Sequence, residues 1–201
     1  MATRNIHVAE LIKAHELVVK SLPDSDVKAF LHKCHTALSQ PGEDTSAGIE
    51  NYPPVCRHLS ASLKIASVAS NEMKALAKAF YPISKMLPWK PRTDYCDQNR
   101  DFYEGHANAV IVGEGGLEAH DSVRMGVSLI APRIEYPNHR HPPEEGYLVL
   151  SEGEWRQEAA PWFKRKSGET IHNSPNIWHA MRAGEHPLLA IWMLWMKTGT
   201  D

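Results

Sequence analysis

Hydrophobic positions along this chain follow two different periods, and the change between them falls near residue 90. In the first ninety residues, apolar side chains recur every three or four positions, the spacing of amphipathic helices. The pattern predicts helices over residues 11–22, 27–38, 53–68 and 73–87, with Asp24 or Ser25 as the cap of the second. These apolar stripes need a partner surface, so we expect Leu11, Phe30, Leu76 and Phe80 to be buried.

The second half of the chain has short, β-rich apolar runs. They follow a segment with two prolines, LPWKPRTDYC, and are separated by Gly, Pro and Asp. The predicted strands cover residues 107–113, 123–132, 146–153, 154–159, 161–168, 177–184 and 187–197. No helix-length pattern alternates with them, which argues against a doubly wound sheet and favours one small antiparallel barrel. We therefore expect a helical region, 1–92, that packs on the barrel or on a dimer partner, and a barrel, 93–201.

Composition narrows the class of protein. The chain has 201 residues, 42% of them hydrophobic and 23% charged, as in globular proteins. A net charge of −2 gives no electrostatic basis for binding nucleic acid or an anionic membrane. The apolar runs are too short to span a bilayer, and the N-terminus lacks a signal-peptide core. Cys34, Cys56 and Cys96 form no CxxC pair, so we expect a reduced, cytoplasmic protein, monomeric or homodimeric.

Ligand-type side chains concentrate in the stretch YPNHRHPPEEGYLVL, residues 136–150. His139 and His141 are two positions apart, so both point to one face of an extended strand. If the proline pair that follows kinks the chain, Glu145 and Tyr147 can face the same way. A third histidine, His179, follows more than 30 residues later at the start of another predicted strand. A polar surface loop would explain an HxH alone, but not this whole set.

Three imidazoles and one carboxylate favour a particular class of metal ion. Zn, Fe, Mn, Co and Ni accept such mixed nitrogen and oxygen ligands. Calcium and magnesium prefer oxygen ligands alone. We expect one divalent transition metal per chain, bound by His139, His141, Glu145 and His179, with Tyr147 or a water able to replace His139.

The two motifs that carry these ligands resemble those of the cupin superfamily. HRHPPEE and GETIHNSPNIWHAM are similar to the first and second cupin motifs, which supply two His and a Glu, and then a His, to one metal in a small jelly-roll (double-stranded β-helix) barrel. The chain resembles most closely the cupin-type dimethylsulfoniopropionate (DMSP) lyases of the DddQ kind. Tyr136, the pattern HxHxxxExY ending at Tyr147, and His179 carry this resemblance. It implies cleavage of DMSP to dimethyl sulfide and acrylate, with a metal-site tyrosine in the chemistry.

Elimination from DMSP needs a base for the proton next to the carboxylate. A tyrosine is ordinarily too weak an acid to serve as a base at neutral pH. A nearby dication favours phenolate, so Tyr147 is the candidate base and Tyr136 the reserve. The soft sulfonium cation suits aromatic faces. Strand alternation places Trp192 and Trp195 on opposite faces, so at most one of them lines the cavity.

Two other functions share the same ligand set. One is a cupin Fe(II) dioxygenase acting on a small thiol or aromatic substrate, which does not need Tyr147. The other is a non-enzymatic cupin domain that senses a small ligand. The first ninety residues show no helix-turn-helix with basic recognition residues, which disfavours a transcription factor.

Overall fold

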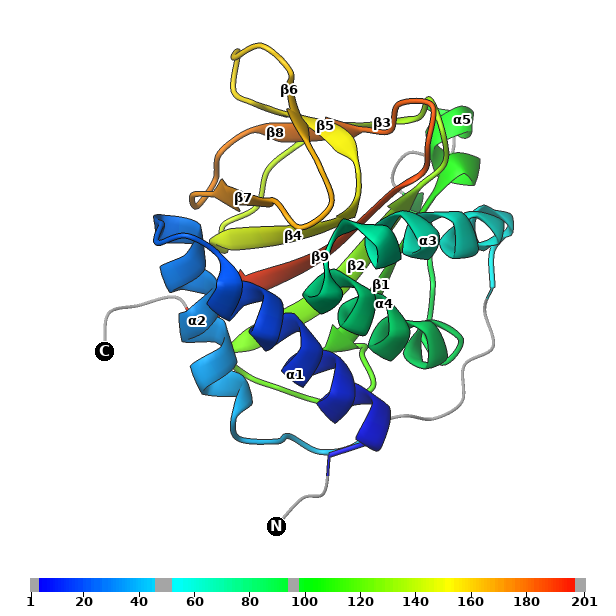
Figure 1. Ribbon diagram of the computed structural model, residues 1–201. Helices are drawn as coiled ribbons and strands as arrows, with labels where there is room; N and C mark the ends of the chain where they lie inside the picture. Colours follow the sequence, from blue (N-terminus) through cyan, green and yellow to red (C-terminus); the bar gives the residue numbers. More distant parts are fainter. Residues whose placement is uncertain (1–3, 46–51, 94–97, 198–201) are drawn as a thin grey trace.

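The computed structural model describes residues 4–45, 52–93 and 98–197 (Figure 1). Helices occupy most of the described part before residue 90. They are α1 (Ile6–Ser21), α2 (Asp26–Leu38), the 3-10 helix η1 (Pro54–His58), α3 (Leu59–Ala69) and α4 (Asn71–Ser84). Ser25 caps α2 by accepting a hydrogen bond from the backbone N–H of Lys28, and Ser70 caps α4 through Met73. The second helix is thus capped by Ser25.

The strands form two antiparallel sheets. Sheet A has the order β1-β2-β9-β4-β7, with strands β1 (His106–Val112), β2 (Val123–Ile130), β9 (Leu188–Trp195), β4 (Glu145–Ser151) and β7 (Thr170–Asn173). Sheet B has the order β3-β8-β5-β6, with strands β3 (Glu135–His139), β8 (His179–Arg182), β5 (Gly153–Gln157) and β6 (Phe163–Arg165). A short helix, α5 (Arg100–Gly105), precedes β1.

The strand pairing identifies the barrel type. β2 pairs with β9, β3 with β8, β4 with β7 and β5 with β6, all antiparallel. The pairs are nested, so strands β2 to β5 run against β6 to β9 as one long hairpin wound into two facing sheets. This is the jelly-roll arrangement of cupins. The predicted fold class, a cupin barrel with N-terminal helices, is confirmed.

The helices cover sheet A only. Figure 1 shows α1 to α4 on the side of sheet A that faces away from sheet B, and one continuous apolar core joins them to that sheet. Leu11, Phe30, Leu76 and Phe80 are all buried in this core, as predicted. Sheet A is therefore buried on both faces, and β4 is buried along its whole length. A second apolar cluster fills the barrel between the two sheets.

Several predicted boundaries were wrong. The third helix divides into η1 and α3, and the fourth ends at Ser84 rather than 87. The strand predicted over 161–168 is only Phe163–Arg165. The sequence patterns missed α5, β3 and β7 because elements of six, five and four residues are too short to show a period.

Two further expectations concern cysteines and membranes. Cys34 and Cys56 are buried free thiols, and burial raises the pKa of each to about 12. Cys96 lies outside the described residues. Within the described ranges, no helix is long and apolar enough to cross a bilayer.

Candidate metal centre

A small cavity opens into the barrel between the two sheets. Its volume is about 130 Å³, and its lining includes Tyr136, His139, His141, Glu145 and Tyr147. These are the predicted site residues of the first motif, and the barrel brings them together because β3 and β4 lie in opposite sheets of one narrow interior. Four residues that the sequence did not single out also line it, namely Arg92, Asn108, Ser128 and Leu194.

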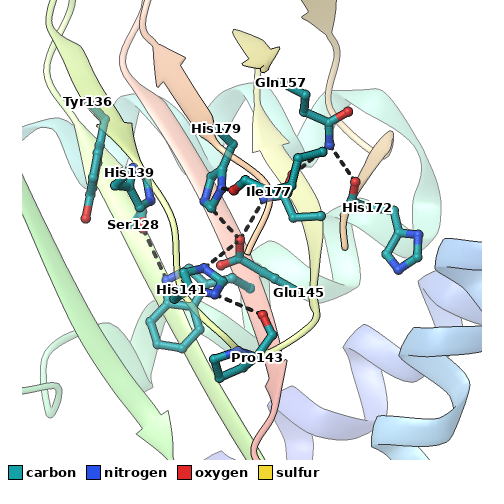
Figure 2. Close-up of polar contacts among 12 residues, drawn as sticks. Ser128, Tyr136, His139, His141, Pro143, Glu145, Gln157, His172, Ile177 and His179 are labelled. Carbon is teal, nitrogen blue, oxygen red and sulfur yellow. Dashed lines mark hydrogen bonds and ion pairs between the residues drawn. The ribbon is translucent and has the colours of Figure 1, made fainter. Parts of the chain in front are cut away.

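His141, Glu145 and His179 form a compact group of possible metal ligands. Their ligand atoms all lie within 4.8 Å of one another. Both imidazole Nε2 atoms are 3.4 Å from the same carboxylate oxygen, Oε2 of Glu145. Figure 2 shows this carboxylate between the two rings. Two ligands at about 2.0–2.1 Å from a tetrahedral ion lie roughly 3.4 Å apart, so the observed separations suit such an ion.

Backbone carbonyls fix the orientation of all three histidines of the predicted set. The Nδ1 atoms of His139, His141 and His179 lie 2.8, 2.9 and 3.0 Å from the carbonyl oxygens of Pro137, Pro143 and Ile177, respectively. A carbonyl can only accept, so Nδ1–H donates and Nε2 of a neutral ring carries the lone pair. This is the outer contact that orients metal-bound histidines in many sites. Nε2 of His179 is buried and has no hydrogen-bond partner among the described residues.

The pKa shifts of His139, His179 and Glu145 suit metal binding, which requires neutral imidazoles and an anionic carboxylate. Burial lowers the pKa of His139 to about 3 and also lowers the pKa of His179. Burial opposes ionisation of Glu145, but His141, His179 and the amide of Asn173 together hold its pKa below the usual value. Burial likewise lowers the pKa of His141, but the neighbouring Glu145 carboxylate outweighs this and the net pKa is raised.

His139 is the least central of the four predicted ligands. It does not belong to the group formed by His141, Glu145 and His179 within the described chain. Its ring packs on that of His179 at 4.1 Å and on that of Tyr136 at 4.5 Å between centroids. His139 and His141 do not share one strand, because β3 ends at His139, but both line the cavity as expected.

Tyr147 lies beside the carboxylate of the group. Its hydroxyl lies close enough to the Glu145 carboxylate for the two groups to interact, and the side chain is buried. Burial and the negative charge of Glu145 raise the pKa of Tyr147 well above the ordinary value of a phenol. In the protein alone, therefore, Tyr147 is a neutral phenol, and a cation is needed to make it a base.

Tyr136 lies on the opposite side of the cavity in a different polar setting. Its hydroxyl oxygen accepts hydrogen bonds from Nη1 of Arg92 and Nδ2 of Asn108, each at 3.3 Å. Burial raises its pKa, and the charge of Arg92 opposes this rise.

The tryptophan prediction is confirmed in its geometry. Trp192 lines the cavity, whereas Trp195 lies on the other face of β9, where Nζ of Lys33 in α2 is 3.9 Å from its ring centroid. The Trp192 indole lies over Gly126, where an added Cβ would come within 2.2 Å of the ring. Its Nε1–H donates to the hydroxyl of Ser128 at 3.1 Å. Gly126 and Ser128 thus hold one wall of the cavity in place.

Outer contacts support the carboxylate ligand. Nδ2 of Asn173 in β7 donates to Oε2 of Glu145 at 2.8 Å, and Nε2 of Gln157 donates to Oδ1 of Asn173 at 2.7 Å. Glu144, the neighbour expected to point away from the site, contacts Nε2 of His172 at 2.7 Å and does not line the cavity. No local sequence pattern marks Asn173 or Gln157, because their roles arise only from the pairing of β4 with β7 and β5 with β8.

The fold and site together define a cupin with a buried histidine–carboxylate centre and an adjacent tyrosine. The family model for dimethylsulfoniopropionate lyase matches residues 27–190. The chain therefore belongs to the DMSP lyase family, a family of carbon–sulfur lyases.

Individual relatives agree with this assignment. Dimethylsulfoniopropionate lyase DddQ of Ruegeria pomeroyi is 30% identical over 122 residues, which is 60% of this chain and 60% of that protein. The alignment thus spans less than two thirds of that relative. The crystal structure of DMSP lyase DddQ from the same organism has a TM-score of 0.75 at 20% identity, covering 98% of this chain and 95% of that one. A chain from crystal structures of the DMSP lyases RdDddP and RnDddQII has a TM-score of 0.72 at 22% identity, covering 94% and 92%. These two structures establish a shared fold.

Proposed function

We propose that this protein cleaves DMSP by β-elimination to dimethyl sulfide and acrylate, with one divalent transition metal in the barrel. The observation that carries the proposal is that Tyr147, His141 and Glu145 line one small cavity, and that His179 forms a compact group of possible metal ligands with the last two. A generic cupin metal site does not need a phenol close to its carboxylate. Membership of the DMSP lyase family supports the choice of substrate.

The residues present fit a metal ion. His141, Glu145 and His179 direct two imidazole lone pairs at one carboxylate oxygen, and electron-rich atoms in this arrangement require a cation between them. A proton on His141 would satisfy one contact, whereas a divalent ion would satisfy both. His139, whose Nε2 is also oriented by a carbonyl, would complete the set, or Tyr147 in its place. When bound, such an ion would act as a Lewis acid on the substrate carboxylate and would favour phenolate nearby.

In the proposed reaction, Tyr147 removes the proton from the carbon next to the carboxylate. The electron pair of that C–H bond forms the double bond of acrylate. The bond between the β-carbon and sulfur breaks, and its electron pair leaves with sulfur, which gives neutral dimethyl sulfide. The proton then resides on the Tyr147 oxygen, close to the Glu145 carboxylate.

Tyr136 is the reserve candidate for the base. Its oxygen is already engaged by two N–H donors, which weakens it as a proton acceptor. This difference supports Tyr147 as the base.

The cavity suits a substrate of this size and charge. About 130 Å³ accommodates a ligand with only a few non-hydrogen atoms. The rings of Tyr147 and Trp192 face the same space, and aromatic faces attract a soft cation such as dimethylsulfonium.

Incubating the purified protein with DMSP tests the proposal directly. We expect dimethyl sulfide in the headspace and an equal amount of acrylate in solution, measured by gas chromatography and proton NMR. Treatment with a chelator should stop the release, and added Zn(II), Fe(II) or Mn(II) should restore it. Absence of both products at full metal occupancy would contradict the proposal, and oxygen consumption with a small thiol would instead favour a dioxygenase.

A further inference from the structure

The segment that joins the helices to the barrel places a positively charged side chain, that of Arg92, at the cavity. Lys90 and Asn108 exchange two backbone hydrogen bonds, at 2.8 and 2.9 Å, so the segment pairs with the edge of β1. Two residues later, the backbone N–H of Arg92 donates to Nε2 of His106 at 3.0 Å. These contacts fix the backbone of Arg92 on both sides of Pro91, and its side chain lines the cavity.

The His106 side chain is held in place by its own contacts, so its hydrogen bond with the backbone of Arg92 fixes the position of that residue. Nδ1 of His106 lies 2.7 Å from the carbonyl oxygen of Phe102, and the two rings stack at 3.8 Å. Because the carbonyl takes the Nδ1 proton, Nε2 is left as the acceptor for Arg92. His106 is 1% exposed and Phe102 also 1%.

The Tyr136 hydroxyl is a second hydrogen-bond donor beside Arg92 in the cavity. A phenol oxygen has two lone pairs and one proton. Arg92 and Asn108 occupy the lone pairs, so the proton of Tyr136 is left to point at a third group. Tyr136 lines the cavity, so a ligand there would accept a hydrogen bond from the Tyr136 hydroxyl.

We propose that Arg92 binds the carboxylate of the substrate, with the Tyr136 hydroxyl as a second donor, and so selects short carboxylates. Among the described residues that line the cavity, Arg92 is the one Lys or Arg. Its charge attracts a carboxylate and repels a sulfonium, so it also orients a zwitterionic substrate with the cationic end away from Arg92. This assignment rests on the proposed function for the identity of the substrate but not for the anion binding itself.

Binding of simple carboxylates tests the assignment without turnover. Propionate and acrylate would be titrated by calorimetry into metal-free and zinc-loaded protein, for the wild type, Arg92→Met and Arg92→Lys. Losing a charge-assisted contact should weaken binding ~10- to 100-fold in Arg92→Met, with a smaller loss in Arg92→Lys. Arg57→Gln removes an exposed positive charge elsewhere and should leave binding unchanged. Equal affinity of Arg92→Met and wild type for both anions would overturn the assignment.

Uncharged ligands keep the test valid even if Arg92→Met does not fold. Propionamide has the shape of propionate without its charge, so metal-free wild-type protein should bind it at least ~10-fold more weakly. Equal binding of the two would contradict a cationic subsite. In turnover, Arg92→Met should raise KM for DMSP more than it lowers kcat, and should lose the preference for DMSP over its amide.

The two proposals fail in different ways. Protein that binds propionate through Arg92 but releases no dimethyl sulfide would contradict the lyase function and support the anion site. Protein that releases dimethyl sulfide with an unchanged KM in Arg92→Met would support the lyase and overturn the role of Arg92.

Discussion

Two groups of histidines lie in different halves of this molecule. His15 and His35 meet between α1 and α2, with Nδ1 of His15 at 2.9 Å from Nε2 of His35. His141 and His179 meet inside the barrel, where both Nε2 atoms face one oxygen of Glu145. Burial lowers the pKa of His15 and of His35, the latter to about 4, and it lowers the pKa of His179 as well.

The direction of the lone pairs separates the two groups. In the helical pair, one ring donates a hydrogen bond to the other, so the lone pair of the accepting nitrogen is already occupied. The outer nitrogens, Nε2 of His15 and Nδ1 of His35, have no hydrogen-bond partner within the described ranges. In the barrel, backbone carbonyls accept hydrogen bonds from Nδ1–H of His141 and His179. The Nε2 lone pairs of the two rings are therefore directed at a carboxylate. Burial and a lowered pKa are therefore poor markers of a ligand site, whereas convergent lone pairs with a carboxylate are a good one.

Removing a ligand should have the largest effect and should do so in the barrel group alone. We expect His141→Ala, Glu145→Ala and His179→Ala each to deplete bound metal and abolish turnover, because each removes one of three converging ligand atoms. Metal per chain would be measured by mass spectrometry of the purified variants. His35→Gln serves as the control, since it removes a buried histidine without touching the cavity. Full metal occupancy in all three variants would contradict the assignment of these residues as ligands. His139→Ala should show the smallest loss of bound metal.

The next largest effect should come from the phenol rather than the ligands. Tyr147→Phe keeps the ring and its packing but removes the oxygen, so turnover should fall by ~10²–10⁴-fold, as for other general acid–base groups. Metal content should stay near that of wild type, which separates this residue from Glu145. Tyr136→Phe, run in parallel, assigns the role, since the base shows the greater loss in kcat. Near-normal turnover in both variants, with the fold intact, would remove tyrosine from the mechanism.

An intermediate effect is expected from the amide that supports the carboxylate. Asn173→Ala removes the hydrogen bond to Oε2 of Glu145 and should weaken metal affinity by ~10–100-fold, the usual range for outer contacts of metal ligands. Asn138→Ala is a matched control, because Asn138 is exposed next to His139. Competition with a zinc-sensitive dye would measure the affinities. Unchanged affinity in Asn173→Ala would show that Glu145 needs no such support.

The sequence predicted which side chains meet at the cavity better than it predicted their surroundings. Glu145 and Tyr147 were predictable because strand alternation places both on one face of β4, and the two motifs indicated His141 and His179. His139 lines the cavity as predicted, but β3 ends there and its ring packs on those of Tyr136 and His179, outside the group of possible metal ligands. Such a break depends on the path of the chain through the proline pair, which no periodicity encodes.

The second-half residues that complete the cavity come from segments distant in sequence. Asn108 lies in β1 and Asn173 in β7, and each reaches the site only through strand pairing. Arg92 arrives from the linker between the two halves, at the boundary predicted between residues 92 and 93. A division of the chain at that point would separate Arg92 from the barrel whose cavity it lines. The jelly-roll strand order, by contrast, could be predicted because two motifs in the sequence resemble those of cupins.

The smallest effect at neutral pH should come from the helical pair, and it should grow as the pH falls. The pKa of His35 is about 4 in the folded protein, against an ordinary value near 6.5. Above pH 6.5 neither state binds the proton, and below it the unfolded chain binds more, so stability is lost as the pH falls from 6.5 toward 4. At about 1.4 kcal/mol per pH unit, one such histidine costs about 2 kcal/mol of stability at pH 5. Urea unfolding of metal-free protein at pH 7.5 and 5 should therefore show a smaller acid loss in His35→Gln than in wild type. His32→Gln, an exposed change on the same helix, should match wild type. An equal acid loss in His35→Gln and wild type would mean that this pair is protonated as easily in the folded chain as in the unfolded one.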